Sequence, residues 1–148
     1  QQGSHAHEVC SAAVDMLKFV EGINIQHEAL GKPWWELRIG IHSGPVIAGT
    51  AGNTFDIWGD AVNIAARLES SGESGKIHIS EKTIDYLEGA GSITPRGKVE
   101  LKNKGTWSTF FLDELNWQKP FASKYFFQSN STKVVLVQVI LLFNGRKL

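Results

Sequence analysis

The sequence predicts a mixed α/β fold in which helices cover a β-sheet. Segments whose apolar residues recur at helical spacing alternate along the chain with short segments of period two. The chain has 148 residues, the size of one domain with a core of its own. Its composition, 42% hydrophobic and 20% charged, argues against a disordered, collagenous or coiled-coil protein.

An amphipathic helix is predicted over residues 5–24. Its apolar residues are spaced by three and four positions, which places them on one face. These residues are Val9, Ala12, Ala13, Met16, Leu17, Val20 and Ile23. Gly31 and Pro33 end any helix before Trp34.

A strand is predicted over Glu36–His42, where Leu37, Ile39 and Ile41 alternate with polar or small residues. Ser43–Pro45 has the composition of a turn, and a second strand begins at Val46–Ala48. We therefore expect these two strands to form a hairpin. The glycine-rich segment Gly49–Gly59 follows and leads into the next helix.

The second helix is predicted over Asp60–Ser70 and carries two stripes. Its apolar stripe consists of Ala61, Ile64, Ala65 and Leu68. Its polar stripe contains Asp60, Asn63 and Arg67, with the last two at positions i and i+4. By itself, such a stripe is typical of a solvated helix face. However, a guanidinium suits phosphate, and an amide can hold a hydroxyl or ribose oxygen.

The next segment predicts a strand at Lys76–Ile79 and a short helix over Glu81–Leu87 with Ser80 as its N-cap. Ile84 and Leu87 of this helix are expected to face inward. Two further strands are expected around Lys98–Lys102 and Trp107–Leu112.

The zero net charge is the sum of two unlike segments. Residues 1–114 hold ten basic and fifteen acidic side chains, whereas residues 115–148 hold five basic and no acidic ones. This asymmetry predicts a domain boundary near residue 114. The apolar run Val134–Phe143 in the second segment could be a buried strand, an interface strand or a segment without a native partner. It is shorter than the roughly 20 residues of a membrane-spanning helix.

The single cysteine, Cys10, cannot form an intramolecular disulfide, and the first residues do not have the pattern of a signal peptide. Both observations favour a cytoplasmic domain. The basic residues of the second segment are scattered among apolar ones, so no nucleic-acid partner is expected.

Several motifs in order resemble the class III adenylyl and guanylyl cyclase catalytic domain. They read HAHEVCSAAVDM, RIGIHSGPVIAG, FDIWGDAVNIAARLESSGESGKIHIS and RGKVELKNKGTWSTFFL. The resemblance covers roughly residues 5–114. It implies a ferredoxin-like α/β sandwich, shortened at its N-terminal side, whose active sites lie between two cyclase domains.

The resemblance also implies a role for each matching residue. Asp56 matches the purine-selecting position, where a carboxylate accepts a hydrogen bond from the adenine amine and opposes the guanine carbonyl. Ile57 and Trp58 lie beside the purine. Asn63 positions the ribose, and Arg67 stabilises charge during attack of the 3′-hydroxyl on the α-phosphate. Lys104 holds the triphosphate; as an alternative, it is an ordinary turn lysine.

The family's two metal-binding aspartates, and the lysine that pairs with the purine-selecting Asp, match no position of this chain. The resemblance thus implies two Mg²⁺ or Mn²⁺ ions whose ligands lie outside it, and no metal ligand among its own residues. This chain would supply the other half-site, acting on ATP to form cyclic AMP for intracellular signalling. Two alternatives remain: a degenerate module that binds nucleotide or a cyclase partner without activity, and a truncated product that does not fold.

Overall fold

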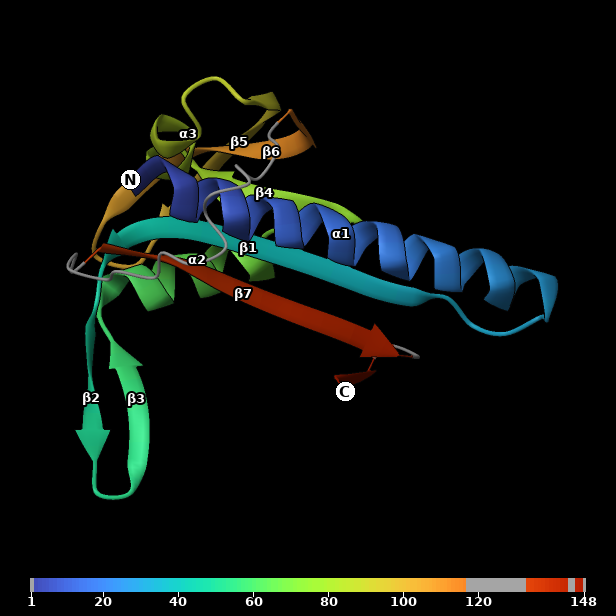
Figure 1. Cartoon of the computed structure of the whole chain (residues 1–148), viewed down its shortest axis with the longest axis horizontal. Coiled ribbons are helices and arrows are strands. Elements are labelled where there is room, and N and C mark those ends of the chain that lie inside the picture. Colours follow the sequence, from blue (N-terminus) through green and yellow to red (C-terminus); the bar gives the residue numbers. More distant parts are fainter. Residues whose placement is uncertain (1, 117–132, 144–145, 148) are drawn as a thin grey trace.

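The computed structural model describes residues 2–116, 133–143 and 146–147 of the chain (Figure 1). Helices and strands alternate, which confirms the mixed α/β class. The helices are α1 (Gln2–Ala29), α2 (Asp60–Ser70) and α3 (Glu81–Leu87). The strands are β1 (Trp35–Pro45), β2 (Ile47–Ala51), β3 (Thr54–Trp58), β4 (Lys76–Ser80), β5 (Gly91–Leu101), β6 (Gly105–Leu115), β7 (Lys133–Phe143) and β8 (Arg146–Lys147). Each predicted helix is present, and α1 extends beyond residues 5–24 at both ends.

The main sheet has six strands in the order β5-β6-β4-β1-β7-β8. β1 and β4 are parallel and the other neighbouring pairs are antiparallel. The connection from β1 to its parallel neighbour β4 passes through α2, as a parallel pair requires a crossover. This βαβ unit places the polar stripe of α2 at the surface beside the β5–β6 hairpin.

The predicted hairpin between residues 36–42 and 46–48 is wrong. β2 pairs with β3, and together they form a separate two-stranded arm that leaves the sheet (Figure 1). Both edges of β1 are taken by β4 and β7, so β1 has no edge to offer β2. The partner strand β3 lies within the glycine-rich segment, and Gly52, with φ of 65°, makes the tight turn of the arm.

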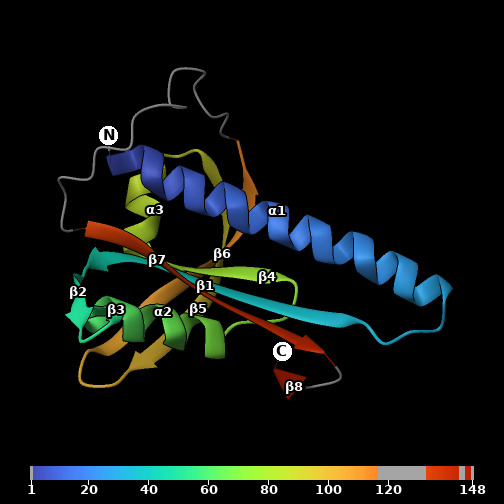
Figure 2. The same cartoon turned by 60° about the horizontal axis from the view of Figure 1, so that its bottom comes forward.

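The helices cover opposite faces of the sheet, with α1 and α3 on one side and α2 on the other (Figure 2). The larger core lies under α1 and α3. It contains Ala6, Cys10, Ala13, Val20, Leu37, Ile39, Ile41, Ile77, Ile79, Leu87 and Leu112. The smaller core, under α2, contains Ile64, Leu68, Val99 and Leu101, with Trp107 packed against it. Alternate residues of β1 therefore face different helices, as its period of two predicted.

Gly40 allows the backbone of α2 to lie directly on β1. A methyl group at this position would lie 2.5 Å from the carbonyl oxygen of Ala65 and closer still to the amide nitrogen of Glu69. Both neighbours are helix backbone, which cannot turn away as a side chain can. The absence of a side chain at Gly40 thus sets how close the site-bearing helix approaches the sheet.

Helix α3 begins as predicted, because the Ser80 side chain accepts a hydrogen bond from the Thr83 amide. Ser80 also belongs to a buried polar network that joins α3 to β1. His42 Nδ1 and Ser80 Oγ are 2.8 Å apart, and Ser43 Oγ donates to Thr83 Oγ1 at 3.2 Å. The Thr83 hydroxyl in turn donates to the carbonyl of Ile41. The network supplies hydrogen-bond partners for four buried polar side chains, those of His42, Ser43, Ser80 and Thr83.

Because His42 in this network is buried, we expect the free energy of unfolding to fall as the solution becomes acidic. Burial, helped by the charge of Lys82, lowers the pKa of His42 to about 4. In the unfolded chain the same imidazole takes up a proton near pH 6.5. The stability that neutral His42 contributes is therefore fully present above pH 6.5 and is lost as the pH falls through about 4. The loss amounts to about 3 kcal/mol. Burial also lowers the pKa of His78, which adds in the same direction.

Urea unfolding between pH 7.5 and 4.5 measures this effect. His42→Gln should flatten the pH dependence of the unfolding free energy, whereas His5→Gln, outside the network, should leave the dependence as in the unmodified chain. An equal slope in the His42→Gln variant and the unmodified chain would contradict the assignment.

The apolar run near the C-terminus forms β7 and lies beside β1 (Figures 1 and 2). The two strands pair along their whole length, from Trp35 opposite Phe143 to Pro45 opposite Lys133. The sequence left open whether this run is a strand or a segment without a native partner. In the structure it is a strand of the main sheet. Residues 117–132 of the basic segment lie outside the described residues. Within the described part of the chain, no helix is long and apolar enough to cross a membrane.

Candidate active site between helix α2 and the β5–β6 turn

A cavity of about 890 Å³ lies between α2 and the end of the β5–β6 hairpin. The predicted polar stripe of α2 forms one wall, and the last residues of β5 with the following turn form the other. The cavity is lined by Asp60, Asn63, Ile64, Arg67, Glu100, Leu101, Lys102, Asn103 and Lys104. Three cationic side chains and two carboxylates thus gather around one space.

The turn that carries Lys104 is held by its own backbone. Asn103 and Gly105 have φ of 61° and 75°, the left-handed conformation that Gly and Asn adopt most readily. The Lys104 amide donates to the carbonyl of Leu101 at 2.9 Å, and Trp107 Nε1 donates to the carbonyl of Lys104 at 3.1 Å. The backbone of Lys104 is therefore fixed at the cavity rim, and its side chain can change direction.

In the structure the Lys104 side chain reaches across the cavity to α2. Its Nζ lies 2.6 Å from Oδ2 of Asp60, at the first residue of the helix. The two side chains are 41% and 69% exposed, and ion pairs of this exposure contribute only ~0.2–1 kcal/mol. Sequence reasoning missed this pair. Its members are 44 positions apart, and no local pattern indicates that the turn and the helix start meet.

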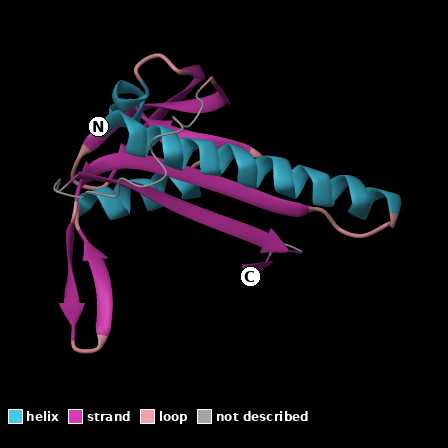
Figure 3. Cartoon of the chain, in the orientation of Figure 1, coloured by secondary structure: helices cyan, strands magenta, loops and turns pink. Residues whose placement is uncertain are grey.

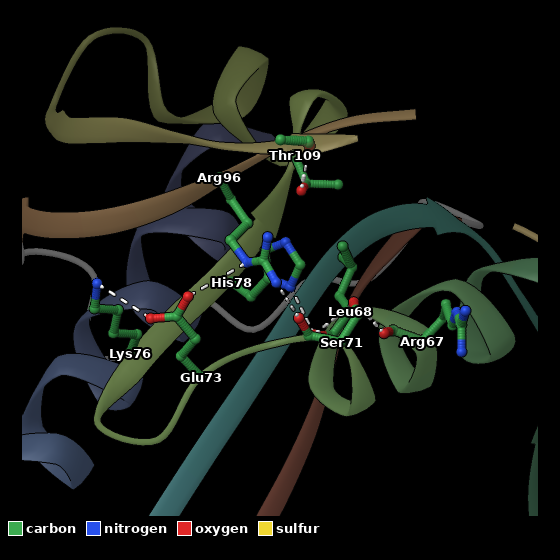
Figure 4. Close-up of polar contacts among 9 residues, drawn as sticks. Arg67, Leu68, Ser71, Glu73, Lys76, His78, Arg96 and Thr109 are labelled. Carbon is green, nitrogen blue, oxygen red and sulfur yellow. Dashed lines mark hydrogen bonds and ion pairs between the residues drawn. The ribbon is translucent and has the colours of Figure 1, made fainter. Parts of the chain in front are cut away.

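Arg67 anchors the other end of the cavity, where its Nε donates to the carbonyl of Glu100 at 3.3 Å. The helix end below it is fixed to the sheet. Ser71 Oγ donates to the carbonyl of Arg67 at 2.7 Å, and Arg96 Nη2 donates to the carbonyl of Ser71 at 3.1 Å. Figure 4 shows this network, with the Arg67 side chain pointing away from it.

The same network continues to β4. His78 Nδ1 lies 2.7 Å from the carbonyl of Leu68 and donates to it, while Glu73 pairs with Lys76 and Arg96 (Figure 4). These contacts bind the last turn of α2 to β4 and β5. They therefore fix the position of Arg67, for which the family resemblance implies a role in stabilising charge.

Glu69 lies on the face of α2 that is turned away from the cavity. Its side chain is 4% exposed and pairs with Arg38 of β1, at 2.9 Å from Nη2 and 3.0 Å from Nε. A buried carboxylate needs such a partner, because burial of an unpaired charge is costly. Glu69 therefore holds the helix to the sheet and is not directed at the cavity.

The structure brings together three of the predicted site residues, Asn63, Arg67 and Lys104, at one cavity. The three predicted purine-site residues, Asp56, Ile57 and Trp58, lie instead on strand β3 of the arm (Figures 1 and 3). Asp56 is exposed, and Trp58 is 41% exposed. Ile57 pairs through its backbone with Ala48, and its side chain lies outside the described residues.

The cavity of this chain does not fit a divalent metal ion. Among the described residues, no three His, Cys, Asp or Glu side chains are grouped as metal ligands. Of the two carboxylates at the cavity, that of Asp60 is paired with Lys104. Mg²⁺ and Mn²⁺ prefer several oxygen ligands, and this wall of the site does not supply them.

Comparison with known protein families gives a match over most of the chain. The family model of the adenylate and guanylate cyclase catalytic domain matches residues 1–114. The chain belongs to this family. The match ends close to the boundary at which the acidic and basic segments of the sequence meet.

Several relatives of this cyclase domain carry the name guanylate cyclase. This chain is 42% identical over 118 residues to guanylate cyclase 32E of Drosophila melanogaster and 40% identical over 114 residues to retinal guanylyl cyclase 2 of Bos taurus. These matches cover 76% and 73% of the chain. The chain spans only about a tenth of each relative, since the matches cover 10% of both.

The solved structures that resemble this cyclase domain include both activities. One is the guanylate cyclase domain of RhGC from Catenaria anguillulae in complex with GTP, with a TM-score of 0.66 and 31% identity. Another is the adenylyl cyclase CyaB from P. aeruginosa, with a TM-score of 0.70 and 27% identity. They cover 75% and 77% of this chain, which in turn covers 60% and 61% of theirs.

Proposed function

We propose that this chain supplies the nucleotide half-site of an adenylyl cyclase that converts ATP to 3′,5′-cyclic AMP and pyrophosphate. The observation that carries the proposal is the meeting of Asn63, Arg67 and Lys104 at one cavity. An amide, a guanidinium and an ammonium there match the ribose, the reacting phosphate and the polyphosphate leaving group. Such a reaction draws on intracellular ATP, so we expect the chain to work in the cytosol as part of a signalling protein.

Each residue has a separate role in this reaction. The Asn63 amide holds the ribose so that its 3′-oxygen faces the α-phosphorus. The 3′-hydroxyl loses its proton to solvent, and its oxygen bonds to the α-phosphorus as the bond from the α-phosphorus to the bridging oxygen of the β-phosphate breaks, so that pyrophosphate leaves. Arg67 stabilises the negative charge that develops on the phosphate oxygens. Lys104 neutralises the pyrophosphate that leaves.

The proposed choice of ATP rests on Asp56. Its carboxylate can only accept hydrogen bonds, and the amine of adenine donates one, whereas guanine has a carbonyl oxygen at the same edge. The two curated relatives described above are named guanylate cyclases, so the choice between ATP and GTP needs a direct test.

Exchange of Asp56 for Asn tests the base. The ratio of kcat/KM for ATP over GTP is measured in a mixture with a second cyclase subunit that supplies the metal ligands. The amide can donate to the guanine carbonyl, so this ratio should fall roughly tenfold or more, as for the loss of one charged hydrogen bond of ~1.5–3 kcal/mol. Asp85→Asn makes the same change at an exposed position of α3 and should leave the ratio unaltered. A preference for GTP in the mixture that contains the unmodified chain would show that Asp56 does not select adenine.

The proposal requires a second cyclase domain. When bound, two Mg²⁺ or Mn²⁺ ions activate the hydroxyl and neutralise phosphate charge; their ligands would come from outside this chain. Apolar surface on the β2–β3 arm supports such a partner, because Ile47 is 71% exposed and Trp58 is 41% exposed. All residues that line the cavity lie within 1–114, which supports a site that does not include residues 115–148.

A complementation assay tests the half-site. The chain is mixed with a cyclase subunit that retains its metal aspartates but is inactivated at the positions of Asn63 and Arg67, and cyclic AMP is measured with ATP and Mn²⁺. We expect activity only in the mixture. Activity of the chain alone would contradict a half-site. Nucleotide binding without activity in the mixture would instead indicate the degenerate, non-catalytic module.

A further inference from the structure

We propose that Asp60 governs access of the nucleotide to Lys104 by competing with the triphosphate for the same ammonium group. This inference rests on the proposed function, in which Lys104 binds the triphosphate. It adds a residue to the site that the motif resemblance leaves without a role.

The competition follows from where the two side chains start. The Lys104 backbone is fixed in its turn by the hydrogen bonds with Leu101 and Trp107, so only its side chain can move. That side chain lies across the cavity, with Nζ 2.6 Å from Asp60 Oδ2. The Lys104 ammonium therefore cannot reach a phosphate without giving up or sharing its carboxylate partner.

The cationic side chains that line the cavity favour the triphosphate over Asp60 as the partner of Lys104. A triphosphate carries several negative charges and meets the cations of Arg67, Lys102 and Lys104 at once. Asp60 offers one negative charge in a pair that solvent reaches, since its side chain is 69% exposed. The triphosphate thus displaces Asp60, but it binds less tightly than it would in a cavity without this carboxylate.

The same competition acts on the leaving group. When pyrophosphate separates from the cyclic product, the Asp60 carboxylate is the anion nearest to Lys104 and can take the ammonium back. Asp60 is in this view a positioning residue. It weakens polyphosphate binding in both directions and shortens the time for which pyrophosphate stays bound.

Binding of inorganic tripolyphosphate to the full 148-residue chain tests the inference without any need for turnover. Isothermal titration compares the unmodified chain with Asp60→Asn, Lys104→Met and the double variant, with ligand extended to millimolar concentration so that weak binding stays measurable. Asp60→Asn should tighten binding about two- to fivefold, the upper part of the range for one exposed ion pair. In the Lys104→Met background the same exchange should change binding less than twofold. Asp85→Asn, outside the cavity, controls for the overall charge.

Two results would overturn the inference. Weaker binding by Asp60→Asn would mean that Asp60 presents Lys104 to the ligand. Equal tightening in both backgrounds would mean that Asp60 acts by general repulsion and not through Lys104. Failure of the unmodified chain to bind either tripolyphosphate or ATP would instead refute the proposed function, and this inference with it.

Discussion

Gly40→Ala is expected to lower the free energy of unfolding by about 3 kcal/mol, as for overpacking of a core that cannot relax. The added methyl group would meet the backbone of Ala65 and Glu69 inside the distance at which atoms can pack. Helix α2 would have to move away from β1. This would also strain the ion pair between the buried Glu69 and the partly exposed Arg38.

Chemical denaturation measures this change, and a second glycine provides the control. Gly22 lies within α1, and a methyl group there would meet no atom within 4 Å. Gly22→Ala should therefore stabilise the chain by roughly 0.5–1 kcal/mol through helix propensity. If Gly40→Ala unfolded at the same denaturant concentration as the unmodified chain, α2 would not be seated on β1 as described.

Arg67→Ala is expected to lower kcat in the complementation assay by about 10²–10³-fold, the usual effect of removing one donor to a developing oxyanion. KM for ATP should change much less, because the charge that Arg67 meets is greatest in the transition state. Arg67→Lys should recover only part of the rate, since an ammonium lacks the planar pair of donors.

The control for Arg67 must remove a positive charge away from the cavity. Lys32 lies in the exposed loop after α1, and Lys32→Ala should keep the full rate. Melting curves of Arg67→Ala, Lys32→Ala and the unmodified chain should coincide, because the Arg67 side chain is exposed and its hydrogen bond to the described part of the chain, to the Glu100 carbonyl, is long. A rise in KM with unchanged kcat would assign Arg67 to ground-state binding.

Residues close together in the chain determined much of what could be predicted. The polar stripe of α2 depends only on helical spacing, and so does the burial of Ala61, Ile64, Ala65 and Leu68. The N-cap at Ser80 is likewise a contact over three residues. These features are encoded by neighbours a few positions apart, so a sequence without any structure suffices to place them.

Two adjacent strands were expected around residues 98–102 and 107–112, and the structure pairs them as the β5–β6 hairpin. The pairing of residues 46–48 was predicted wrongly. The glycine-rich segment conceals β3, and competition for the edges of β1 is a property of the whole sheet. The pattern of a few neighbouring residues cannot show which strand pairs with each edge of β1.

The sequence by itself determined the two faces of helix α2 and the mixed α/β class, and the residues proposed to meet a nucleotide came from its resemblance to the cyclase family. Only the tertiary structure decided that the turn at Lys104 lies against the start of α2, that Asp60 is its partner there, and that Gly40 sets the depth of the helix on the sheet. The physical reason is separation along the chain. Spacing of a few residues fixes which side chains share a face, whereas contacts between residues tens of positions apart arise only when the βαβ unit and the hairpin pack together.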